Sequence, residues 1–248
     1  MRTKYLLTLA VCLLFGRIAL SAPADDGKPS ISPYGVMTDK NGKENTDSTF
    51  SGSAPMTVRF YANAKNADGW NTYYEWRFFL TDLRGNESDT PYLIRYEEDT
   101  EYTFTKAGLN KIVCYAVFTN GNDTVNYTDE YWSGATPLTV SISESQLEMP
   151  NAFSPNGDGH NDIYRAKQDK LQSIVEFHAY IYNRWGQLLY EWTDPYNGWD
   201  GTYHGKDVKQ GVYFCLVKAK GADGKKFNIR TDVNLLRGFT ESTDSNSF

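Results

Sequence analysis

Residues 150–162 have the sequence PNAFSPNGDGHND. Two prolines, two glycines, three asparagines and two aspartates surround a single phenylalanine in this stretch. A helix or a regular strand does not accommodate this composition, because proline lacks a backbone donor and glycine is costly to order. The stretch therefore predicts a shaped loop. It follows a strand-like run at 138–143 and precedes a second aromatic-rich region, so it also predicts the entrance to a second domain.

Alternating apolar and polar residues before this loop predict a first group of strands. Residues 58–62 and 74–80 alternate, 111–118 is apolar on both faces, and Leu138, Val140 and Ile142 close the region. Short turns rich in glycine, asparagine and aspartate separate these runs. Such a pattern is typical of an antiparallel sandwich.

The region after the loop repeats this pattern. Val175, Phe177, Ala179 and Ile181 are predicted to share one face, as are Leu188, Tyr190 and Trp192, with a turn at 183–186 between the two strands. Further strands are predicted at 212–217 and 227–235, and a second tight turn at 198–201. The predicted fold class is therefore all-β, with two consecutive immunoglobulin-like antiparallel β-sandwich domains.

We expect the first domain to span residues 30–144 and the second to span 148–238. Residues 22–29 are predicted to be a flexible lead and 239–248 a polar tail. Residues 1–21 combine a basic start, a short apolar run and small residues before the expected cleavage site, which is typical of a secretory signal peptide. The alternative is a lipoprotein signal that ends at Cys12, but Val11 fits that motif poorly. Export is the expectation, with no transmembrane segment after the signal is removed.

The chain is acidic, with 25 basic and 31 acidic residues and a net charge of −6. Removal of the signal would take away three basic residues and lower the net charge to −9. Because no basic cluster is present, we do not expect nucleic acid to be a partner. Cys114 and Cys215 lie in apolar runs of different halves, so we expect two buried free thiols instead of a disulfide.

The sequence offers little support for catalysis. Its three histidines are His160, His178 and His204, and none has a serine or cysteine placed as a nucleophile partner. Glu97 and Glu98 are consecutive, so their side chains should point apart. No phosphate-binding loop, metalloprotease helix or Cys-x-x-Cys motif is present. We therefore predict a protein that is not an enzyme, with no catalytic residue and no cofactor.

A candidate calcium site lies in the 150–162 stretch. Asn156, Asp158 and Asp162 supply oxygen ligands, and Gly157 and Gly159 allow the chain to curl tightly. Calcium prefers such oxygen ligands on a glycine-bent loop. The same residues also form Asx turns without an ion, so both interpretations remain open.

The aromatic residues raise a carbohydrate-binding hypothesis, since exposed aromatic rings can stack on sugars. Trp76 alternates with core residues and is expected to be buried. The candidates near turns are Tyr127, Tyr131, Trp132, Trp192 and Trp199. Packing in the core is the alternative for these side chains.

Five ordered blocks in the second region carry a family resemblance. They are PNAFSPNGDGHND, YNRWGQLLYE, GWDGTYHGK, GVYFCL and VNLLR. Residues 148–238 resemble the gliding motility-associated C-terminal domain, the type B sorting domain of the type IX secretion system in the Bacteroidetes. The resemblance implies recognition by the outer-membrane type IX secretion machinery and export through the periplasm to the cell surface or beyond. The family usually ends just after its last strand, whereas here residues 238–248 follow.

The first region resembles a PKD-type immunoglobulin-like domain. The matching segments are residues 54–60, 74–76 and 102–104, with Gly108 before a strand. This resemblance implies a spacer or a surface for contact with a protein or a glycan. The predicted function is thus a non-enzymatic exported protein that its C-terminal domain directs to type IX secretion, with the PKD-like module as spacer or adhesive cargo. The alternative is a secreted carbohydrate-binding protein that uses exposed aromatic side chains.

Overall fold

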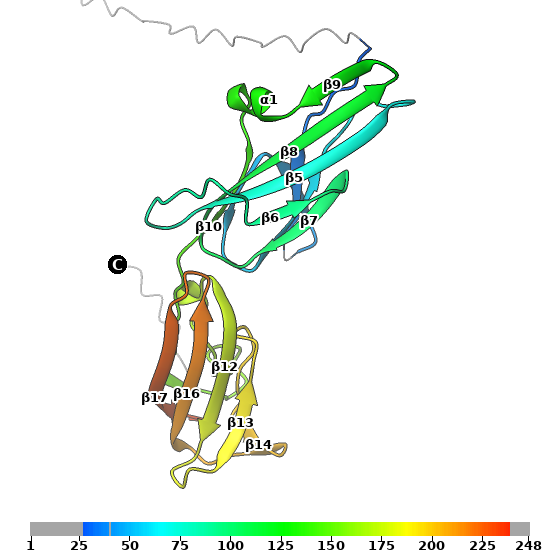
Figure 1. Ribbon diagram of the computed structural model, residues 1–248. Helices are drawn as coiled ribbons and strands as arrows, with labels where there is room; N and C mark the ends of the chain where they lie inside the picture. Colours follow the sequence, from blue (N-terminus) through cyan, green and yellow to red (C-terminus); the bar gives the residue numbers. More distant parts are fainter. Residues whose placement is uncertain (1–26, 40, 239–248) are drawn as a thin grey trace, which may run out of the picture.

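The computed structural model describes residues 27–39 and 41–238. The expected signal peptide at 1–21 and the expected polar tail at 239–248 lie outside the described residues. The described chain forms two β-rich domains in succession, joined by a short segment after Ile142 (Figure 1). The predicted all-β fold class, with two consecutive domains of mostly antiparallel strands, is confirmed. The N-terminal domain is the predicted sandwich of two sheets, whereas the C-terminal domain has one five-stranded sheet and a two-stranded hairpin.

The N-terminal domain is a sandwich of two sheets. One sheet has the strand order β2-β1-β4-β7, and the other has the order β3-β10-β8-β5-β6, with β9 also paired to β8. Its strands are β1 (Tyr34–Thr38), β2 (Glu44–Asp47), β3 (Thr49–Gly52), β4 (Met56–Tyr61), β5 (Asn71–Thr81), β6 (Leu93–Arg95), β7 (Asp99–Phe104), β8 (Gly108–Asn120), β9 (Asp123–Tyr127) and β10 (Leu138–Ile142). A short helix, α1 (Asp129–Gly134), was not predicted from the sequence.

Aromatic rings fill the space between the two sheets of this domain. Phe60 of β4 lies 5.9 Å from Trp76 and 5.8 Å from Phe78 of β5, measured between ring centroids. All three side chains are fully buried, as the alternation along β4 and β5 predicts. Burying each of them removes a large apolar area from water and stabilises the fold by about 1.5–3 kcal/mol.

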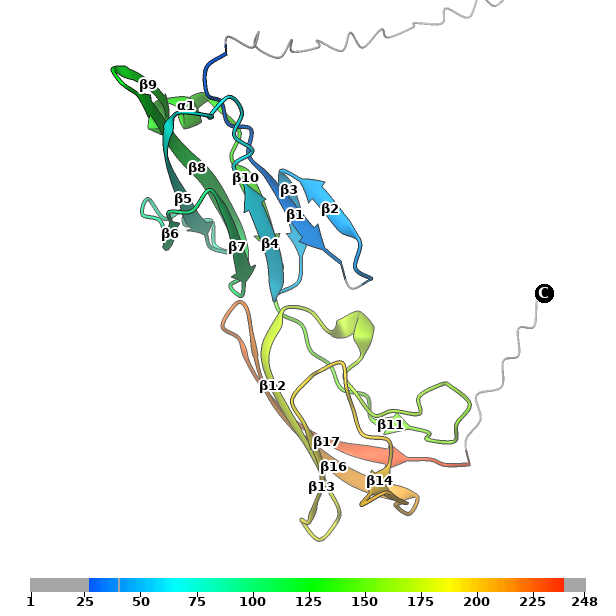
Figure 2. The same cartoon turned by 90° about the vertical axis from the view of Figure 1, so that its right-hand side faces the viewer.

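The C-terminal domain is built on a single five-stranded sheet with the order β11-β17-β16-β12-β13. The strands are β11 (Ala152–Phe153), β12 (Ile174–Tyr182), β13 (Leu188–Trp192), β16 (Gly211–Gly221) and β17 (Lys226–Leu235). The layer opposite this sheet consists mostly of loops, together with the 3₁₀ turn η1 (Gln168–Lys170) and the hairpin of β14 (Thr202–Tyr203) and β15 (Lys206–Asp207) (Figure 2).

Two bulges change the predicted faces of β12 and β13. The pairing of β12 with β16 shifts between Ile174 and Glu176, so Ile174 enters the C-terminal core while Val175 packs against the N-terminal core. The prediction that Val175 shares the core face of Phe177 was therefore wrong. Leu188 and Trp192 were predicted to share one face, but Leu188 is 40% exposed and Trp192 is buried. The reason is a shift in the pairing of β12 with β13 between Ile181 and Tyr182. A one-residue shift sends a side chain to the opposite face of a sheet.

Candidate functional site

Loops of the C-terminal domain that are far apart in sequence meet around Phe153, Tyr164 and Trp199, and together they form the loop cluster. Phe153 of the first block lies 5.6 Å from Tyr164 and 5.4 Å from Trp199, measured between ring centroids. Trp199 is fully buried and donates its indole N–H to the carbonyl of Thr202 at 2.7 Å. These rings occupy the space that a second sheet would fill in an ordinary sandwich. The loops of this domain therefore supply their rings to one core that they share with the buried face of the sheet.

Backbone contacts lock this cluster together. Tyr164 and Trp199 exchange two backbone hydrogen bonds, of 2.8 and 3.0 Å. A Cβ atom on the neighbouring Gly198 would lie 2.3 Å from the Tyr164 carbonyl oxygen, which is a clash with backbone. Glycine is required at this position because no side chain fits between the two segments.

Arg237, the last residue of the VNLLR block, connects several segments of the loop cluster. Its guanidinium group donates hydrogen bonds to the carbonyl oxygens of Gly201 at 2.7 Å, Pro155 at 3.1 Å and Val208 at 3.3 Å. It also forms an ion pair with Asp207 at 3.3 Å. The side chain of Arg237, just after β17, thus connects three segments. They are residues 150–162, which we call the entry loop, the turn at 198–201, and the segment before β16. Sequence reasoning assigned no role to Arg237.

The predicted metal ligands lie within one turn of the entry loop. The Asp162 carboxylate accepts backbone N–H groups of Asn156 at 3.0 Å, Gly157 at 2.7 Å and Gly159 at 2.8 Å. These hydrogen bonds, that from Gly157 first, hold the pKa of Asp162 below its usual 3.8. Asp158 accepts the N–H of His160 at 2.8 Å, and Asn156 accepts the N–H of Asp158 at 3.0 Å. The loop thus has the Asx-turn geometry that the sequence offered as one interpretation.

The calcium interpretation stays a prediction. Within residues 27–39 and 41–238, no group of three or more His, Cys, Asp or Glu side chains gathers as a metal site. The candidate calcium ligands are two aspartates and one asparagine, so they do not form a group of that kind. An ion at Asn156, Asp158 and Asp162 would share oxygen atoms that already accept hydrogen bonds.

Most of the sequence-selected aromatic residues belong to the cores. Trp76 and Trp199 are fully buried and Trp192 is 6% exposed, while Tyr127 and Trp132 pack against the N-terminal core. Tyr131 is 37% exposed. The core-packing alternative is therefore confirmed for Trp192 and Trp199, and neither can act as a surface platform.

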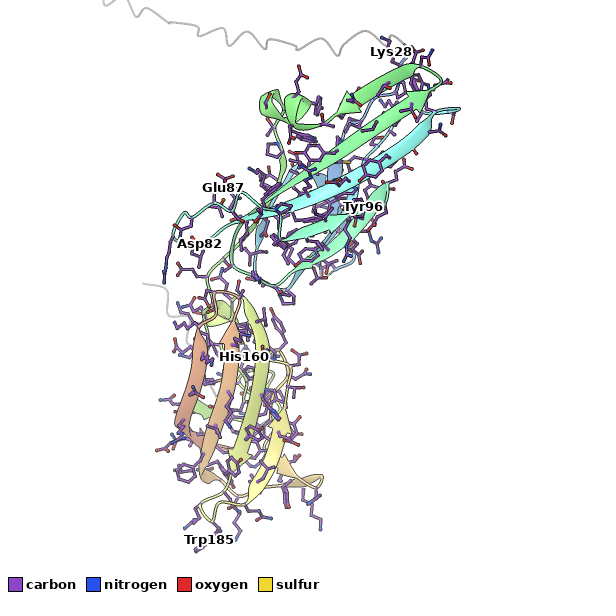
Figure 3. The ribbon with its side chains drawn as sticks, viewed as in Figure 1. Lys28, Asp82, Glu87, Tyr96, His160 and Trp185 are labelled. Carbon is purple, nitrogen blue, oxygen red and sulfur yellow. The ribbon has the colours of Figure 1, made fainter. Side chains whose placement is uncertain are left out.

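Other aromatic rings are exposed instead. Trp185 is 84% exposed at the tip of the turn between β12 and β13, at the end of the C-terminal domain far from the N-terminal domain (Figure 3). Asn183 fixes this turn, since its side-chain oxygen accepts the N–H groups of Trp185 and Gln187 at 3.0 Å each. Val212 and Phe214 are 50% and 44% exposed on the adjoining β16. A rigid turn thus presents an indole ring to solvent.

The histidines and cysteines have structural surroundings. His178 contacts Tyr180 through one ring nitrogen at 3.0 Å and Glu191 through the other at 3.2 Å, on the outer face of the sheet. Cys114 and Cys215 are free thiols buried in different cores, as predicted. Burial raises the pKa of both thiols, that of Cys215 to about 11. A thiol with so high a pKa is a poor nucleophile at neutral pH.

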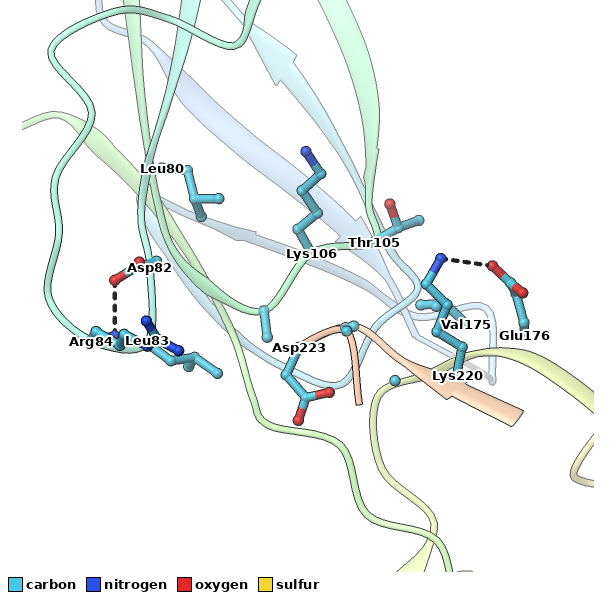
Figure 4. Close-up of a pocket in the computed structure, with 14 residues that line it drawn as sticks. Leu80, Asp82, Leu83, Arg84, Thr105, Lys106, Val175, Glu176, Lys220 and Asp223 are labelled. Carbon is cyan, nitrogen blue, oxygen red and sulfur yellow. Dashed lines mark hydrogen bonds and ion pairs between the residues drawn. The ribbon is translucent and has the colours of Figure 1, made fainter. Parts of the chain in front are cut away.

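A groove of about 720 Å³ lies where the two domains meet (Figure 4). Two of its charged side chains form an ion pair, Lys220 with Glu176 at 3.0 Å, and the Asp82 carboxylate accepts the backbone N–H of Arg84 at 2.9 Å. The backbone N–H of Ala107 donates to the carbonyl of Ala222 at 3.0 Å across the junction. This groove is the outer edge of a domain interface.

Comparisons with known proteins place the C-terminal domain in a family. Residues 147–230 match the model of the CHU_C type IX secretion signal domain. No curated protein matches the chain. No helix among the described residues is both long and apolar enough to span a bilayer.

Three solved structures match this chain at low identity and low TM-score. The SGBP-B protein of the mixed-linkage glucan utilization locus of Bacteroides ovatus, in complex with a mixed-linkage heptasaccharide, is 17% identical with a TM-score of 0.26, over 84% of this chain and 47% of that one. This chain thus spans about half the length of that protein. A tetra-tandem repeat from the extending region of a large adhesion protein is 12% identical with a TM-score of 0.23, over 84% and 68%. The FN1–FN3 domains of chicken CNTN1 are 8% identical with a TM-score of 0.26, over 80% and 75%.

Proposed function

We propose that this chain is a non-enzymatic protein whose C-terminal domain routes its N-terminal domain out of the cell, because residues 147–230 match the CHU_C type IX secretion signal domain. The signal implies export to the cell surface or the extracellular space. In the full proposal the chain passes through the periplasm, and the outer-membrane type IX secretion machinery recognises the C-terminal domain. The N-terminal domain is then a PKD-like spacer or adhesive cargo.

The observation that carries this proposal is the match to the signal domain together with the loop cluster. Within the matching region, the rings of Phe153, Tyr164 and Trp199 pack together and hold the loops that carry them. A domain built in this way has a fixed surface that a receptor can recognise, because its loops are held by buried rings and by Arg237.

The position of the exposed indole supports the same role. Trp185 lies at the end of the C-terminal domain opposite the junction with the N-terminal domain (Figure 3). A partner could therefore contact this end while the cargo remains attached at the other. Exposed tryptophan side chains are frequent anchors of protein interfaces.

The non-enzymatic assignment is supported by the state of the reactive groups. Burial raises the pKa of both thiols, and His178 is engaged with Tyr180 and Glu191 on an open sheet face. In the groove at the domain junction, Lys220 pairs with Glu176, and Asp223 accepts hydrogen bonds from Ser145.

Routing is tested in a bacterium that has a working type IX system. A fluorescent reporter with a cleavable signal peptide is fused to residues 144–248, because Ser145 hydrogen-bonds to Asp223 within the C-terminal domain. We expect the fusion to reach the surface or the medium, and a strain without the outer-membrane translocon to retain it. A fusion that stays in the periplasm, protected from added protease, would refute the routing role. The full chain truncated after residue 143 is the matched control and should not leave the periplasm.

A further inference from the structure

The outer face of the larger N-terminal sheet carries a cluster of aromatic and polar side chains, which lies apart from the loop cluster and from Trp185 of the C-terminal domain. Tyr73, Glu75 and Arg77 alternate outward along β5, and Tyr96 follows β6 beside them. We call these four residues the Tyr73–Tyr96 platform. The alternation along β5 directs Tyr73 away from the core. Tyr96 lies beside Tyr73 because β6 pairs with β5.

The two tyrosine rings are exposed. Tyr73 is 48% and Tyr96 62% exposed, and their ring centroids lie 6.1 Å apart with the ring planes at 45°. Tyr96 faces outward from the middle of the domain in Figure 3. Neither ring belongs to the buried core of the sandwich, which contains Phe60 and Trp76. The pair therefore presents apolar ring surface to solvent.

A network of polar contacts holds Tyr73, Glu75 and Arg77 of the platform in place, and Tyr96 contacts Tyr73 through its ring. Glu75 accepts the hydroxyl of Tyr73 at 2.8 Å and the guanidinium of Arg77 at 2.5 Å. Burial raises the pKa of Glu75, but the hydrogen bonds from Arg77 and Tyr73 outweigh it and leave the pKa lowered, so the carboxylate is charged at neutral pH. The Arg77 guanidinium lies 4.0 Å from the ring centroid of Tyr115, whose hydroxyl donates to Asp129.

We propose that the Tyr73–Tyr96 platform binds a neutral polysaccharide. Amphipathic rings suit the C–H faces of sugars, and the carboxylate, guanidinium and phenol groups can exchange hydrogen bonds with sugar hydroxyls. The groups are already held in place by the network, so little ordering cost remains for binding. The two carboxylates of Glu75 and Asp129 disfavour an anionic ligand. Apart from Ile94, the exposed side chains here are rings and polar groups, which does not suit an apolar helix of a protein partner.

The test uses purified mature chain in native gels that contain xyloglucan, galactomannan or soluble starch, with alginate as the anionic comparison. We expect at least one neutral polysaccharide to retard the protein and alginate to leave its mobility unchanged. Y73A/Y96A should weaken the affinity at least about tenfold, which corresponds to 1.4 kcal/mol. Tyr96→Phe keeps the ring and should bind nearly as well as the wild type.

Trp185→Ala is the matched control, because Trp185 is an exposed ring in the other domain. It should bind like the wild type. Mobility unchanged by every neutral polysaccharide would overturn the proposal, as would a Y73A/Y96A protein that melts normally and is still retarded. The gels use purified protein and need no secretion machinery. The outcome is therefore separate from that of the routing experiment.

Discussion

Ser145 donates both its backbone N–H and its hydroxyl to the carboxylate of Asp223, at 3.1 Å and at 2.7–2.8 Å. Ser145 lies in the segment that joins the domains, and Asp223 lies in the turn between β16 and β17. Burial raises the pKa of Asp223, but the hydrogen bonds from Ser145 and Lys225 outweigh it and the net pKa is lowered. The joining segment is thus tied to the C-terminal domain.

Further contacts between the two domains hold them in one arrangement at their junction, which we call the joint. Ser173 accepts the N–H of Ala54 at 3.1 Å and exchanges a hydrogen bond with Ser143 at 2.9 Å. Val175 and Ala222 of the C-terminal domain pack against the N-terminal core. The position of the cargo relative to the signal domain therefore depends on a few small side chains.

Removing the Asp223 carboxylate should loosen the joint. Asp223→Ala leaves the N–H and hydroxyl of Ser145 without this acceptor, so we expect a loss of about 1–3 kcal/mol in the stability of the C-terminal domain. Small-angle X-ray scattering should show a wider distribution of domain orientations. Asp89→Ala, at an exposed aspartate of the N-terminal domain, is the control and should leave both unchanged. A rigid joint in Asp223→Ala would contradict the assigned role of this pair.

Arg237 should be essential for the stability of the loop cluster. Arg237→Ala removes three hydrogen bonds to carbonyl oxygens, so we expect the free energy of unfolding to fall by about 1–3 kcal/mol. Chemical denaturation measures this change. Arg230 is an exposed arginine on β17, the strand that precedes Arg237, and Arg230→Ala should cost within about 0.5 kcal/mol. Equal stability of the two variants would show that Arg237 does not clamp the cluster.

Trp185 and Trp199 should separate recognition from folding. Trp185→Ala should change stability by no more than about 0.5 kcal/mol, because the side chain is 84% exposed, and yet reduce secretion of the full chain. Trp199→Ala should cost about 3–5 kcal/mol, because it empties the centre of the loop cluster. Thermal melting and the secreted fraction are measured for each variant. Normal secretion of Trp185→Ala would remove the indole from the recognised surface and leave the routing role intact.

The entry loop should lose stability in acid. The folded-state pKa of Asp162 lies below the usual 3.8, so its stabilising effect is fully present above that value and is lost as the pH falls through the folded-state pKa. Asp162→Asn should therefore be less stable than the wild type at neutral pH, and the difference should shrink below pH 3.8. Urea denaturation at several pH values measures this difference. A gap that is constant with pH would mean that the charge of Asp162 plays no part.

Calcium binding at Asn156, Asp158 and Asp162 predicts a metal-dependent melting temperature. A ligand that binds only the folded state raises stability with its concentration, so EDTA should lower the melting temperature and excess calcium should restore it. Asp158→Asn should abolish this response while keeping the Asx-turn acceptor. A melting temperature that does not respond to EDTA would assign the loop to Asx turns alone.

Much of the β architecture can be predicted from local sequence. Alternation places Phe60, Trp76 and Phe78 in the core because side chains on a strand point to opposite faces in turn. Proline and glycine mark the 150–162 loop because they restrict or free the backbone locally. The family match of the C-terminal domain likewise follows from blocks that are visible along the chain.

Other features depend on contacts between distant segments, and these only the tertiary structure decided. Val175 leaves the predicted face because a bulge forms against β16, and Arg237 finds its acceptors in three loops that precede it by tens of residues. Tyr96 meets Tyr73 only because β6 pairs with β5. The sequence by itself determined where the long core strands and the main turns lie, since those follow from backbone and side-chain preferences. The pairing of strands decided which side chains meet, because register and packing are set across the whole fold.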